Sequence, residues 1–556
     1  MPPVRPPRSW TLLLAALGGL ATDTAFPARS WWPMAYLGIA LLVLALRRDS
    51  VLWGWLVGFV WGLGFFLPHL WWANHAVGEP IGWLALSTAE AALVGVFGAG
   101  AVLVRRAPGL RDRVWAQILA VAVLWVSIEQ FRARWPFEGF PWGFLAFSQT
   151  DAPLLPLASI GSTVLVSGVV VVIGAALAHA AVRLRELRVG AASALVVVAA
   201  ACAFAPLLVP LGTQPESGSL RVGAVQGSVP EAGADASSQA AAVTENHAAG
   251  TEALLDRVAP GELDLVIWPE SSADIDPRTD QLTADVIDGA ARAVDAPILL
   301  GTQRYLADPQ EPEARARFNE LVLWEAGTGA VPELVYAKQH PVPFGEYMPY
   351  REFFRMFTEA VDLVSIDMLP GTEMGLMSLP LERLGRDVPV SVGICFEVAY
   401  DELIRESVVA GGELIVIPTN NASFGLTQES SQQLAMSRFR AVEHGRAVVQ
   451  ISTVGVSGIV TPNGVFQDRT GLWTAEEMVD TVPLRTTLTV ADRLGQWPAL
   501  VAGALAGVGL LGGLVGTVER AVTRSSGSRR TGGRRSGTGR RGSGRRGTGR
   551  RGTGRR

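Results

Sequence analysis

Three polar motifs in the middle of the chain each follow an apolar run that is typical of a β-strand. The first contains Glu270, the second contains Lys338 followed eight residues later by Glu346, and the third contains Cys395. A carboxylate can take the proton of a thiol, an ammonium group can stabilise a thiolate or an oxyanion, and a thiolate can attack a carbonyl carbon. Together these residues predict a cysteine nucleophile that forms a thioester. Alone, Glu270 would be read as a helix cap or an ion-pair partner.

Lys338 is the only lysine among 47 basic residues, and all the others are arginine. Arginine cannot release a proton near neutral pH, whereas a desolvated lysine can. The retention of one lysine in such a composition favours a chemical role over chance. Between Lys338 and Glu346 the sequence QHPVPFG is rich in Pro and Gly, so we expect a loop that holds the two side chains in a fixed geometry.

Cys395 lies where a predicted strand ends and where the chain is expected to enter a helix over 397–409. A cysteine at a helix N-terminus is favoured as the thiolate, and the next backbone N–H groups can bind an oxyanion. A buried structural cysteine is the alternative, which the neighbouring Glu397 disfavours. The second cysteine, Cys202, lies in an apolar run, so no disulfide framework is suggested.

A cysteine–histidine dyad is the competing interpretation of the same nucleophile. The histidines of the middle region are His247, His340 and His444. His340 is two residues from Lys338 and points elsewhere if that loop is extended. We therefore expect the Glu-Lys-Cys arrangement rather than the dyad.

The region that must position these residues alternates apolar runs with helical patterns, which predicts a layered α/β domain. The expected core strands are 220–226, 263–268, 297–302, 321–324, 388–395, 413–418 and 448–453. The expected helices are 237–258, 279–294, 397–409 and 430–444.

The rest of the chain is apolar enough for a membrane. Of its 556 residues, 49% are hydrophobic and only 18% are charged, which argues against both a disordered chain and an ordinary soluble enzyme. Thirteen of the 17 tryptophans precede residue 211, many of them at the ends of apolar stretches, as an interfacial belt requires. Stretches of spanning length are expected near 10–25, 32–46, 51–73, 81–104, 114–130, 161–182, 189–211 and 497–518.

Arginines in alternate loops orient these spans. They lie before the first span and in the loops after the second, fourth and sixth, which places those loops and the N-terminus in the cytoplasm. Seven spans then put residues 212–496 outside, and the eighth returns the C-terminus to the cytoplasm. Within the spans, Glu90 is either a functional carboxylate or a helix–helix hydrogen-bond partner, and His179 is expected at the interface.

Net charge separates the chain into corresponding regions. Residues 1–211 carry +5 and form a membrane domain of about seven helices, and residues 212–496 carry −22 and form the α/β domain. Residues 497–520 form the last span, and residues 521–556 form a disordered Arg/Gly-rich tail. We expect the tail to contact lipid or to set topology, and we expect no nucleic-acid partner.

Several segments carry a resemblance to a known family. They are WPES at 268–271, YAKQHPVPFGEYMP at 336–349, GICFE at 393–397, PTNNASFG at 418–425, QQLAMSRFRAVEHGR at 432–446 and WPFEGFPWG at 135–143. In this order they resemble the apolipoprotein N-acyltransferase family, the membrane-embedded branch of the nitrilase (carbon–nitrogen hydrolase) superfamily. The resemblance reaches to about residue 520 and implies an αββα sandwich outside the membrane.

The resemblance also implies the roles of individual residues. Glu270 would be the general base, Lys338 the electrostatic stabiliser and Cys395 the nucleophile, with Glu346 and Glu397 as supporting carboxylates. Many members have Tyr after the nucleophile, whereas Phe396 offers only its backbone N–H here. The segment 229–245 lacks the Trp-containing lid sequence that the resemblance would lead us to expect.

The implied reaction is ping-pong acyl transfer. A phospholipid would acylate the cysteine, and the α-amino group of a diacylglyceryl-cysteine at an apolipoprotein N-terminus would accept the chain. No metal or diffusible cofactor is implied, the location is the inner (cytoplasmic) membrane, and a monomer is the default. A membrane-tethered amidase or nitrilase that uses water is one alternative, and a non-catalytic receptor or transporter is another.

Overall fold

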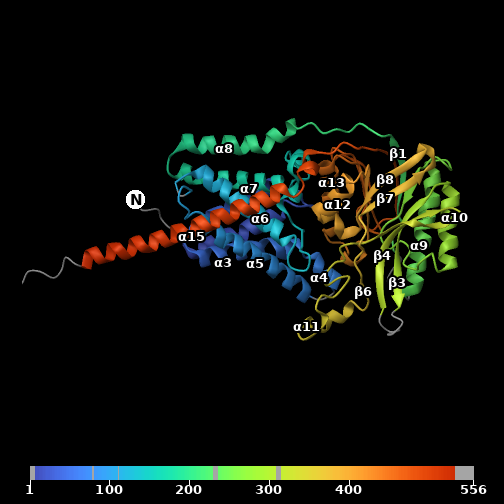
Figure 1. The fold of residues 1–556 in the computed structure, drawn as a ribbon, viewed down its shortest axis with the longest axis horizontal. Coiled ribbons are helices and arrows are strands. Elements are labelled where there is room, and N and C mark those ends of the chain that lie inside the picture. Colours follow the sequence, from blue (N-terminus) through green and yellow to red (C-terminus); the bar gives the residue numbers. More distant parts are fainter. Residues whose placement is uncertain (1–6, 78–79, 111, 230–235, 308–314, 533–556) are drawn as a thin grey trace, which may run out of the picture.

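The computed structural model describes residues 7–77, 80–110, 112–229, 236–307 and 315–532. The chain forms two parts that lie end to end, a bundle of apolar helices and an α/β domain with two sheets (Figure 1). The N-terminal helices and the last helix form the bundle, and the middle of the chain forms the α/β domain.

The bundle is held by close helix packing. Its helices are α1 (Arg8–Asp23), α2 (Pro33–Ala45), α3 (Val51–His69), α4 (Trp72–Val77), α5 (Pro80–Val104), α6 (Val114–Arg132), α7 (Ala158–Arg185), α8 (Val189–Phe204) and α15 (Trp497–Gly532), with short 3-10 turns η1 (Leu145–Gln149), η2 (Leu155–Leu157) and η3 (Ala205–Leu208). Glycines let α3 and α5 approach each other, because a Cβ added at Gly58 or Gly98 would lie 2.2 Å from a backbone oxygen of the other helix. Small residues serve this purpose in membrane helices.

Six of the described helices are long and apolar enough to cross a membrane. They are Val51–His69, Pro80–Val104, Val114–Arg132, Leu155–Arg185, Val189–Leu208 and Trp497–Thr523. Helices form at all eight expected positions, but α1 has 16 residues and α2 has 13. Both are shorter than the roughly 20 residues that a perpendicular span requires. These lengths are close to those of the expected stretches 10–25 and 32–46, and whether the two short helices cross a membrane stays a prediction.

The last helix is longer than expected. α15 continues to Gly532, past residue 520, beyond which the sequence analysis placed a disordered tail. Residues 519–524, ERAVTR, contain good helix formers, so the helix can propagate by one hydrogen bond per residue once it has started. The remainder of the tail, residues 533–556, lies outside the described residues.

Two sheets form the centre of the α/β domain. The first has the order β13-β1-β2-β3-β4-β5, with β6 paired to β4, and the second has the order β12-β11-β10-β9-β8-β7. The strands of the first are β1 (Ser219–Gln226), β2 (Leu265–Ile267), β3 (Ile298–Ala307), β4 (Arg315–Glu325), β5 (Gly329–Ala337), β6 (Asp367–Met368) and β13 (Glu476–Pro483). Those of the second are β7 (Leu376–Leu381), β8 (Arg386–Val392), β9 (Leu414–Thr419), β10 (Val448–Ser452), β11 (Gly458–Val460) and β12 (Phe466–Arg469).

Helices cover the outer face of each sheet, which gives four layers. The helices of this domain are α9 (Ala236–Ala253), α10 (Gln281–Val294), α11 (Arg351–Arg355), α12 (Asp401–Val409), α13 (Glu429–His444) and α14 (Val490–Leu494), with short 3-10 turns elsewhere. α9 and α10 lie on the far side of the first sheet, and α12 and α13 lie between the second sheet and the bundle (Figure 1). Between the sheets, alternate residues such as Val222, Leu265, Val390 and Val416 are fully buried. This is the αββα arrangement that the resemblance implies.

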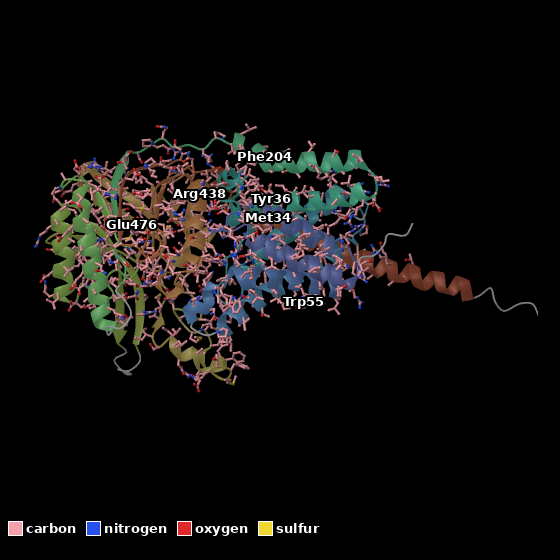
Figure 2. All side chains as sticks on the ribbon, turned by 180° about the vertical axis from the view of Figure 1, so that it is seen from behind. Met34, Tyr36, Trp55, Phe204, Arg438 and Glu476 are labelled. Carbon is pink, nitrogen blue, oxygen red and sulfur yellow. The ribbon has the colours of Figure 1, made fainter. Side chains whose placement is uncertain are left out.

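One hydrophobic core runs from the bundle into the α/β domain. It includes Phe147 and Leu155 from the bundle side and Phe396 and Phe439 from the domain. Figure 2 shows Arg438 of α13 where the two parts meet, and this side chain forms an ion pair with Asp151 that precedes α7. The two parts are therefore packed as one body through α12 and α13.

Candidate active site

The three residues expected to perform chemistry follow the C-terminal ends of three strands. Glu270 follows β2, Lys338 follows β5 and Cys395 follows β8, while Asn420 follows β9. The central strands β1-β2-β3 and β8-β9-β10 are parallel, so their C-terminal ends meet at one edge of each sheet. The two edges face each other, and the structure brings all three side chains together there.

Lys338 lies between two carboxylates. Its Nζ is 3.3 Å from Oε1 of Glu270 and 2.6 Å from Oε1 of Glu346, and its side chain is fully buried. Burial alone would lower the pKa of Lys338, but the charges of Glu270 and Glu346 outweigh it and raise the pKa well above its usual value. The lysine is therefore an ammonium group at every physiological pH.

Glu270 is held by two further donors. Asn319 on β4 donates from Nδ2 to Oε1 over 2.6 Å, and the backbone N–H of Asn420 donates to Oε2 over 2.8 Å. Both carboxylate oxygens are thus oriented before any substrate arrives. The sequence analysis missed Asn319, which lies in the strand motif RFNELVLW with no local feature to mark it.

Cys395 opens a 3-10 turn, η7 (Cys395–Ala399), in the left-handed backbone region with φ of 56°. The helix expected from 397 begins only at Asp401, because Tyr400 is extended and separates the turn from α12. Cys395 is therefore the first residue of a short 3-10 helix, and the prediction that an α-helix begins at 397 is wrong. A left-handed conformation is costly for a residue other than glycine and is found where the surrounding structure enforces it, often at functional sites.

Neighbouring groups shift the pKa of the Cys395 thiol in opposite directions. Burial and then the charge of Glu270 raise its pKa above the usual value, while Lys338 lowers it. Gln433 of α13 also approaches, with Nε2 3.5 Å from Sγ. At neutral pH the group rests as a thiol, so it needs a base at the moment of attack.

Glu397 ties the lysine loop to the cysteine turn. It accepts hydrogen bonds from the backbone N–H of Ile394 (2.6 Å), Gln339 (2.7 Å) and His340 (3.0 Å) and from the hydroxyl of Tyr336 (2.9 Å). Burial raises its pKa, although these donors oppose the rise. Glu397 thus acts by positioning two segments, and its carboxylate has no free oxygen to offer a substrate.

The histidines take other partners. His340 Nδ1 lies 3.0 Å from Oε2 of Glu138, and its ring stacks on Tyr400 at 4.5 Å. His444 contacts Asp492 at 2.6 Å, and His247 contacts a backbone oxygen of its own helix. Among the described residues no histidine hydrogen-bonds to the nucleophile, which favours the Glu-Lys-Cys arrangement over the dyad.

Phe396, directly after the nucleophile, packs on the bundle. Its ring stacks on Trp142 with 5.5 Å between centroids and 1° between planes, and on Phe140 at 5.7 Å. Trp142 in turn donates to Gln432 of α13 over 2.7 Å. The loop 135–143 therefore packs against the turn that carries the nucleophile, a role that the sequence analysis did not assign to any of its residues.

An intramembrane ion pair supports that loop. Arg132 at the end of α6 donates to Oε2 of Glu90 (3.1 Å) and to the backbone oxygens of Phe140 (3.0 Å) and Trp142 (2.8 Å). Of the two interpretations of Glu90, a structural helix–helix contact matches this geometry. The carboxylate is buried and paired with the same guanidinium group that holds the loop.

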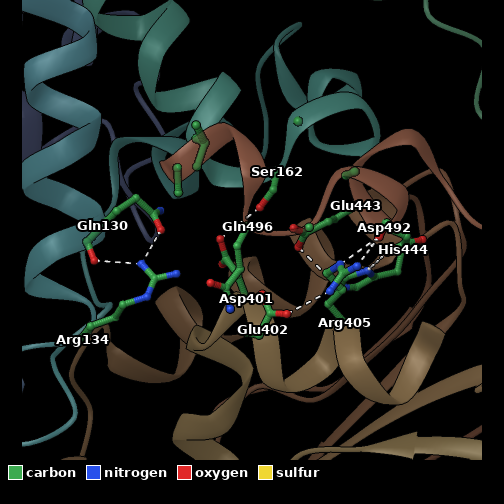
Figure 3. A pocket seen from close by; sticks show the side chains of 15 residues that line it. Gln130, Arg134, Ser162, Asp401, Glu402, Arg405, Glu443, His444, Asp492 and Gln496 are labelled. Atoms are coloured by element: carbon green, nitrogen blue, oxygen red, sulfur yellow. Dashed lines mark hydrogen bonds and ion pairs between the residues drawn. The ribbon is translucent and has the colours of Figure 1, made fainter. Parts of the chain in front are cut away.

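Polar contacts between the bundle and the α/β domain hold the segment that follows the nucleophile. They line a small pocket where the two parts meet. Figure 3 shows Asp401, the first residue of α12, beside Ser162 of α7. Ser162 Oγ donates to Asp401 over 3.0 Å, and Arg440 of α13 donates to the same carboxylate over 2.6 Å. α7 is kinked at Gly161 and Ser162, which turns the hydroxyl toward the domain. The strained turn at Cys395 is thus fixed at its end to a membrane helix.

Two expectations are not settled by these contacts. Within the described residues, no group of three or more His, Cys, Asp or Glu side chains could hold a metal ion, and the expected lack of a cofactor stays a prediction. Of the segment 229–245, in which the sequence analysis noted the missing lid motif, residues 230–235 lie outside the described part of the chain.

Comparison with known proteins identifies the family. The chain matches the sequence model of the apolipoprotein N-acyltransferase N-terminal domain over residues 18–176 and that of carbon-nitrogen hydrolase over residues 221–491. It is 37% identical to the apolipoprotein N-acyltransferase of Mycolicibacterium smegmatis, covering 87% of this chain and 82% of the relative. It is 30% identical to that of Azotobacter vinelandii, covering 87% and 92%.

Solved structures include an amidase of the nitrilase superfamily from Nesterenkonia AN1, which is 16% identical with a TM-score of 0.34 and covers 49% of this chain and 94% of the amidase. The assignment rests on the sequence relatives and on the two matched domains. The chain belongs to the apolipoprotein N-acyltransferase family and is a membrane N-acyltransferase with a carbon–nitrogen hydrolase domain.

Proposed function

We propose that the reaction proceeds through two half-reactions on Cys395. In the first, the thiolate attacks the ester carbonyl of a phospholipid, a thioester forms and a lyso-phospholipid leaves with the proton that the thiol gave up. In the second, the α-amino group of the N-terminal diacylglyceryl-cysteine of an apolipoprotein attacks the thioester. An amide forms, the amine loses a proton and the thiol is restored.

The side chains divide the work as follows. Glu270 takes the thiol proton and delivers it to the leaving glycerol oxygen, then takes a proton from the attacking amine. Lys338 and the backbone N–H of Phe396 stabilise the oxyanion in both tetrahedral intermediates. Glu346 holds the ammonium group of Lys338 in place. The convergence of Glu270, Lys338 and Cys395 in one buried site carries this proposal.

The architecture supports a membrane-facing reaction. We infer that residues 1–211 and 497–520 form the membrane domain with about eight helices and that 212–496 form the catalytic domain outside the inner membrane. The distribution of arginines supports cytoplasmic N- and C-termini. Both substrates are lipid-anchored, and the stack of Phe396 on the bundle brings the nucleophile turn next to the membrane helices. The enzyme is proposed to act as a monomer.

Intact mass spectrometry of the full chain tests the mechanism. After incubation with phospholipid, the wild type should gain one acyl chain that hydroxylamine removes, and the Cys395→Ser variant should gain none. Addition of a diacylglyceryl-cysteine peptide should then move the chain to the peptide amine. Discharge to water at the same rate with and without peptide would identify a hydrolase instead. Absence of any adduct on lipid-bound wild type would rule out the acyl-enzyme.

A further inference from the structure

A cleft opens in the bundle at the end remote from the catalytic domain. α2, α5 and α7 end there and α6 begins there, so its position is the membrane face opposite the active site (Figure 1). Four polar side chains, those of Arg47, Arg105, Gln117 and His179, line the cleft together with aliphatic side chains such as Val121. We call it the Arg47–Arg105 cleft.

The cleft carries excess positive charge. No Asp or Glu is found among its described lining residues, and the charges of Arg47, Arg105 and Arg183 all act on the imidazole of His179. Asp49 is the carboxylate whose charge acts on Arg105. Its two oxygens, however, are already engaged.

Both partners of Asp49 lie outside the cleft. Arg106 donates to one oxygen over 2.7 Å, and Arg520 of α15 donates to the other over 2.9 Å. Arg47 is exposed at the rim, and the structure gives it no ion pair with a described carboxylate. The guanidinium groups of Arg47 and Arg105 are therefore left to balance an anion from outside the protein.

The groups around Arg47 and Arg105 favour a lipid phosphate over a free phosphate ion. Guanidinium groups bind phosphate oxygens with paired hydrogen bonds, and basic pockets between membrane helices at the cytoplasmic face suit anionic headgroups. The aliphatic walls of α2, α5, α6 and α7 offer no partner to a free, fully hydrated phosphate ion but can pack against an acyl chain. An ammonium-bearing headgroup would meet Arg47 and Arg105 with its own positive charge.

We propose that the Arg47–Arg105 cleft binds the headgroup of an anionic phospholipid, with its acyl chains against the aliphatic walls. This lipid is distinct from the acyl donor, since the catalytic residues lie at the other end of the bundle. It would bridge four helices, of which only α5 and α6 are joined to each other by a loop at this end.

Native mass spectrometry of the delipidated full chain in detergent tests the proposal. The probe is an equimolar mixture of phosphatidylglycerol and phosphatidylcholine with distinguishable chain lengths. Wild type should retain phosphatidylglycerol in clear preference. At the contribution typical of an arginine near a membrane surface, Arg47→Gln should weaken that retention about fivefold and Arg47→Gln/Arg105→Gln about thirtyfold. Arg113→Gln, the same change at the exposed start of α6 and outside the cleft, should leave it unchanged.

Three results would overturn the proposal. They are equal retention of the two lipids, an equal loss in Arg113→Gln, and displacement of the lipid by millimolar inorganic phosphate, which would identify a free-ion site. Thioester formation on Cys395 should be unaffected in Arg47→Gln and serves as the measure of folding. Because Arg47 is exposed, the single variant carries the test even if the double variant fails to fold.

Discussion

Cys395 owes its reactivity to neighbours that act on it in opposite directions. Burial and Glu270 keep the group a thiol at rest, and Lys338 favours the thiolate. A cysteine of low pKa would be a permanent thiolate that is open to oxidation and intrinsically less nucleophilic than a thiolate of high pKa, whereas a thiol with its base at hand ionises only during attack. The charges around the sulfur atom therefore keep it protonated until Glu270 removes the proton during attack.

These opposed effects give the first prediction. Glu270→Gln removes a negative charge and should lower the pKa of Cys395, so alkylation by iodoacetamide at a fixed pH of about 8 should become faster than in wild type. Lys338→Met removes a positive charge and should raise the pKa further, so alkylation should slow. Both variants should lose acyl transfer by at least about a thousandfold.

The rate of alkylation measured from pH 7 to 10.5 separates the two variants. In wild type it should still rise at the top of this range, because the raised pKa lies above the value of a free thiol. A plateau near pH 8.5 in wild type, or shifts of the same sign in both variants, would contradict the opposed effects of Glu270 and Lys338 on the thiol.

Glu397 gives the second prediction. Glu397→Gln retains the size of the side chain but turns one acceptor oxygen into a donor that faces the backbone N–H groups of Ile394 or Gln339. Loss of hydrogen bonds to a charged acceptor costs about 1.5–3 kcal/mol each. The rate of thioester formation should fall roughly a hundredfold. Tyr336→Phe removes only one of the four donors and should cost tenfold or less; equal losses in the two variants would show that Glu397 does not connect the segments.

At the scale of elements, α13 connects the active site to the bundle. Neighbouring residues on a helix point about 100° apart. Gln432 therefore meets Trp142 and the backbone oxygen of His69 in the bundle, while Gln433 approaches the nucleophile. A shift of this helix would alter the contacts of Gln432 and Gln433 at once. A movement of the bundle would therefore also move the group that contacts the sulfur atom.

The start of α12 gives the third prediction. Asp401→Ala removes a half-buried carboxylate that Arg440 and Ser162 both contact in the junction, and a hydrogen bond to a charged group typically contributes about 1.5–3 kcal/mol. Glu402→Ala, one residue later on the same helix, breaks a half-exposed pair with Arg405 and should cost less than about 1 kcal/mol. Thermal unfolding in detergent should show a clear drop in Tm for the first variant only. Equal shifts would mean that charge at the helix N-terminus, and not the junction, is responsible.

At the scale of the whole molecule, the two parts share one hydrophobic core. Phe396 and Phe439 of the catalytic domain belong to the same buried cluster as Phe147 and Leu155 of the bundle. The bundle covers the outer face of α13, whereas α12 meets the bundle at its first residue, Asp401. The bundle is thus a structural layer of the catalytic domain as well as its membrane anchor.

Trp142 gives the fourth prediction. Trp142→Ala removes a fully buried ring that stacks on Phe396 and leaves the amide oxygen of Gln432 without its donor. Truncations of buried tryptophan cost about 3–5 kcal/mol. Thioester formation should fall with the loss of a fixed Phe396 N–H. Trp142→Phe keeps a stacking ring and should recover most of the rate, which kinetic intact-mass measurements would show; no recovery would assign the effect to the indole N–H instead.

The shared core gives the fifth prediction. A fragment of residues 212–496 should not fold as a soluble monomer, because it would expose Phe396 and the apolar face of α13 around Phe439. Size-exclusion chromatography without detergent should show aggregates and no monomer peak. The same fragment with polar substitutions at Phe396 and Phe439 serves as the comparison and should gain solubility. A monomeric, stably folded wild-type fragment would show that the bundle is dispensable for folding.

The local pattern of apolar residues was enough to predict the strands that are buried on both faces of a sheet. β1, β2, β8, β9 and β10 are nearly continuous apolar runs, and each was predicted within a few residues. β5, β6, β7, β11, β12 and β13 were missed. These strands are half exposed or no more than three residues long, so their burial pattern is weak before the partner strand is known.

The sequence by itself determined the candidate reactive residues, because a sole lysine, a strand-end glutamate and a strand-end cysteine are local features. It also determined which segments are apolar. Only the tertiary structure decided which groups hold them. Asn319 lies 49 residues from Glu270, and Gln432 lies 290 residues from Trp142. Such contacts depend on how the sheets and the bundle pack, and no spacing along the chain encodes them. The left-handed backbone at Cys395 is likewise a feature of the folded chain, because Glu397 ties this turn to the loop that follows β5.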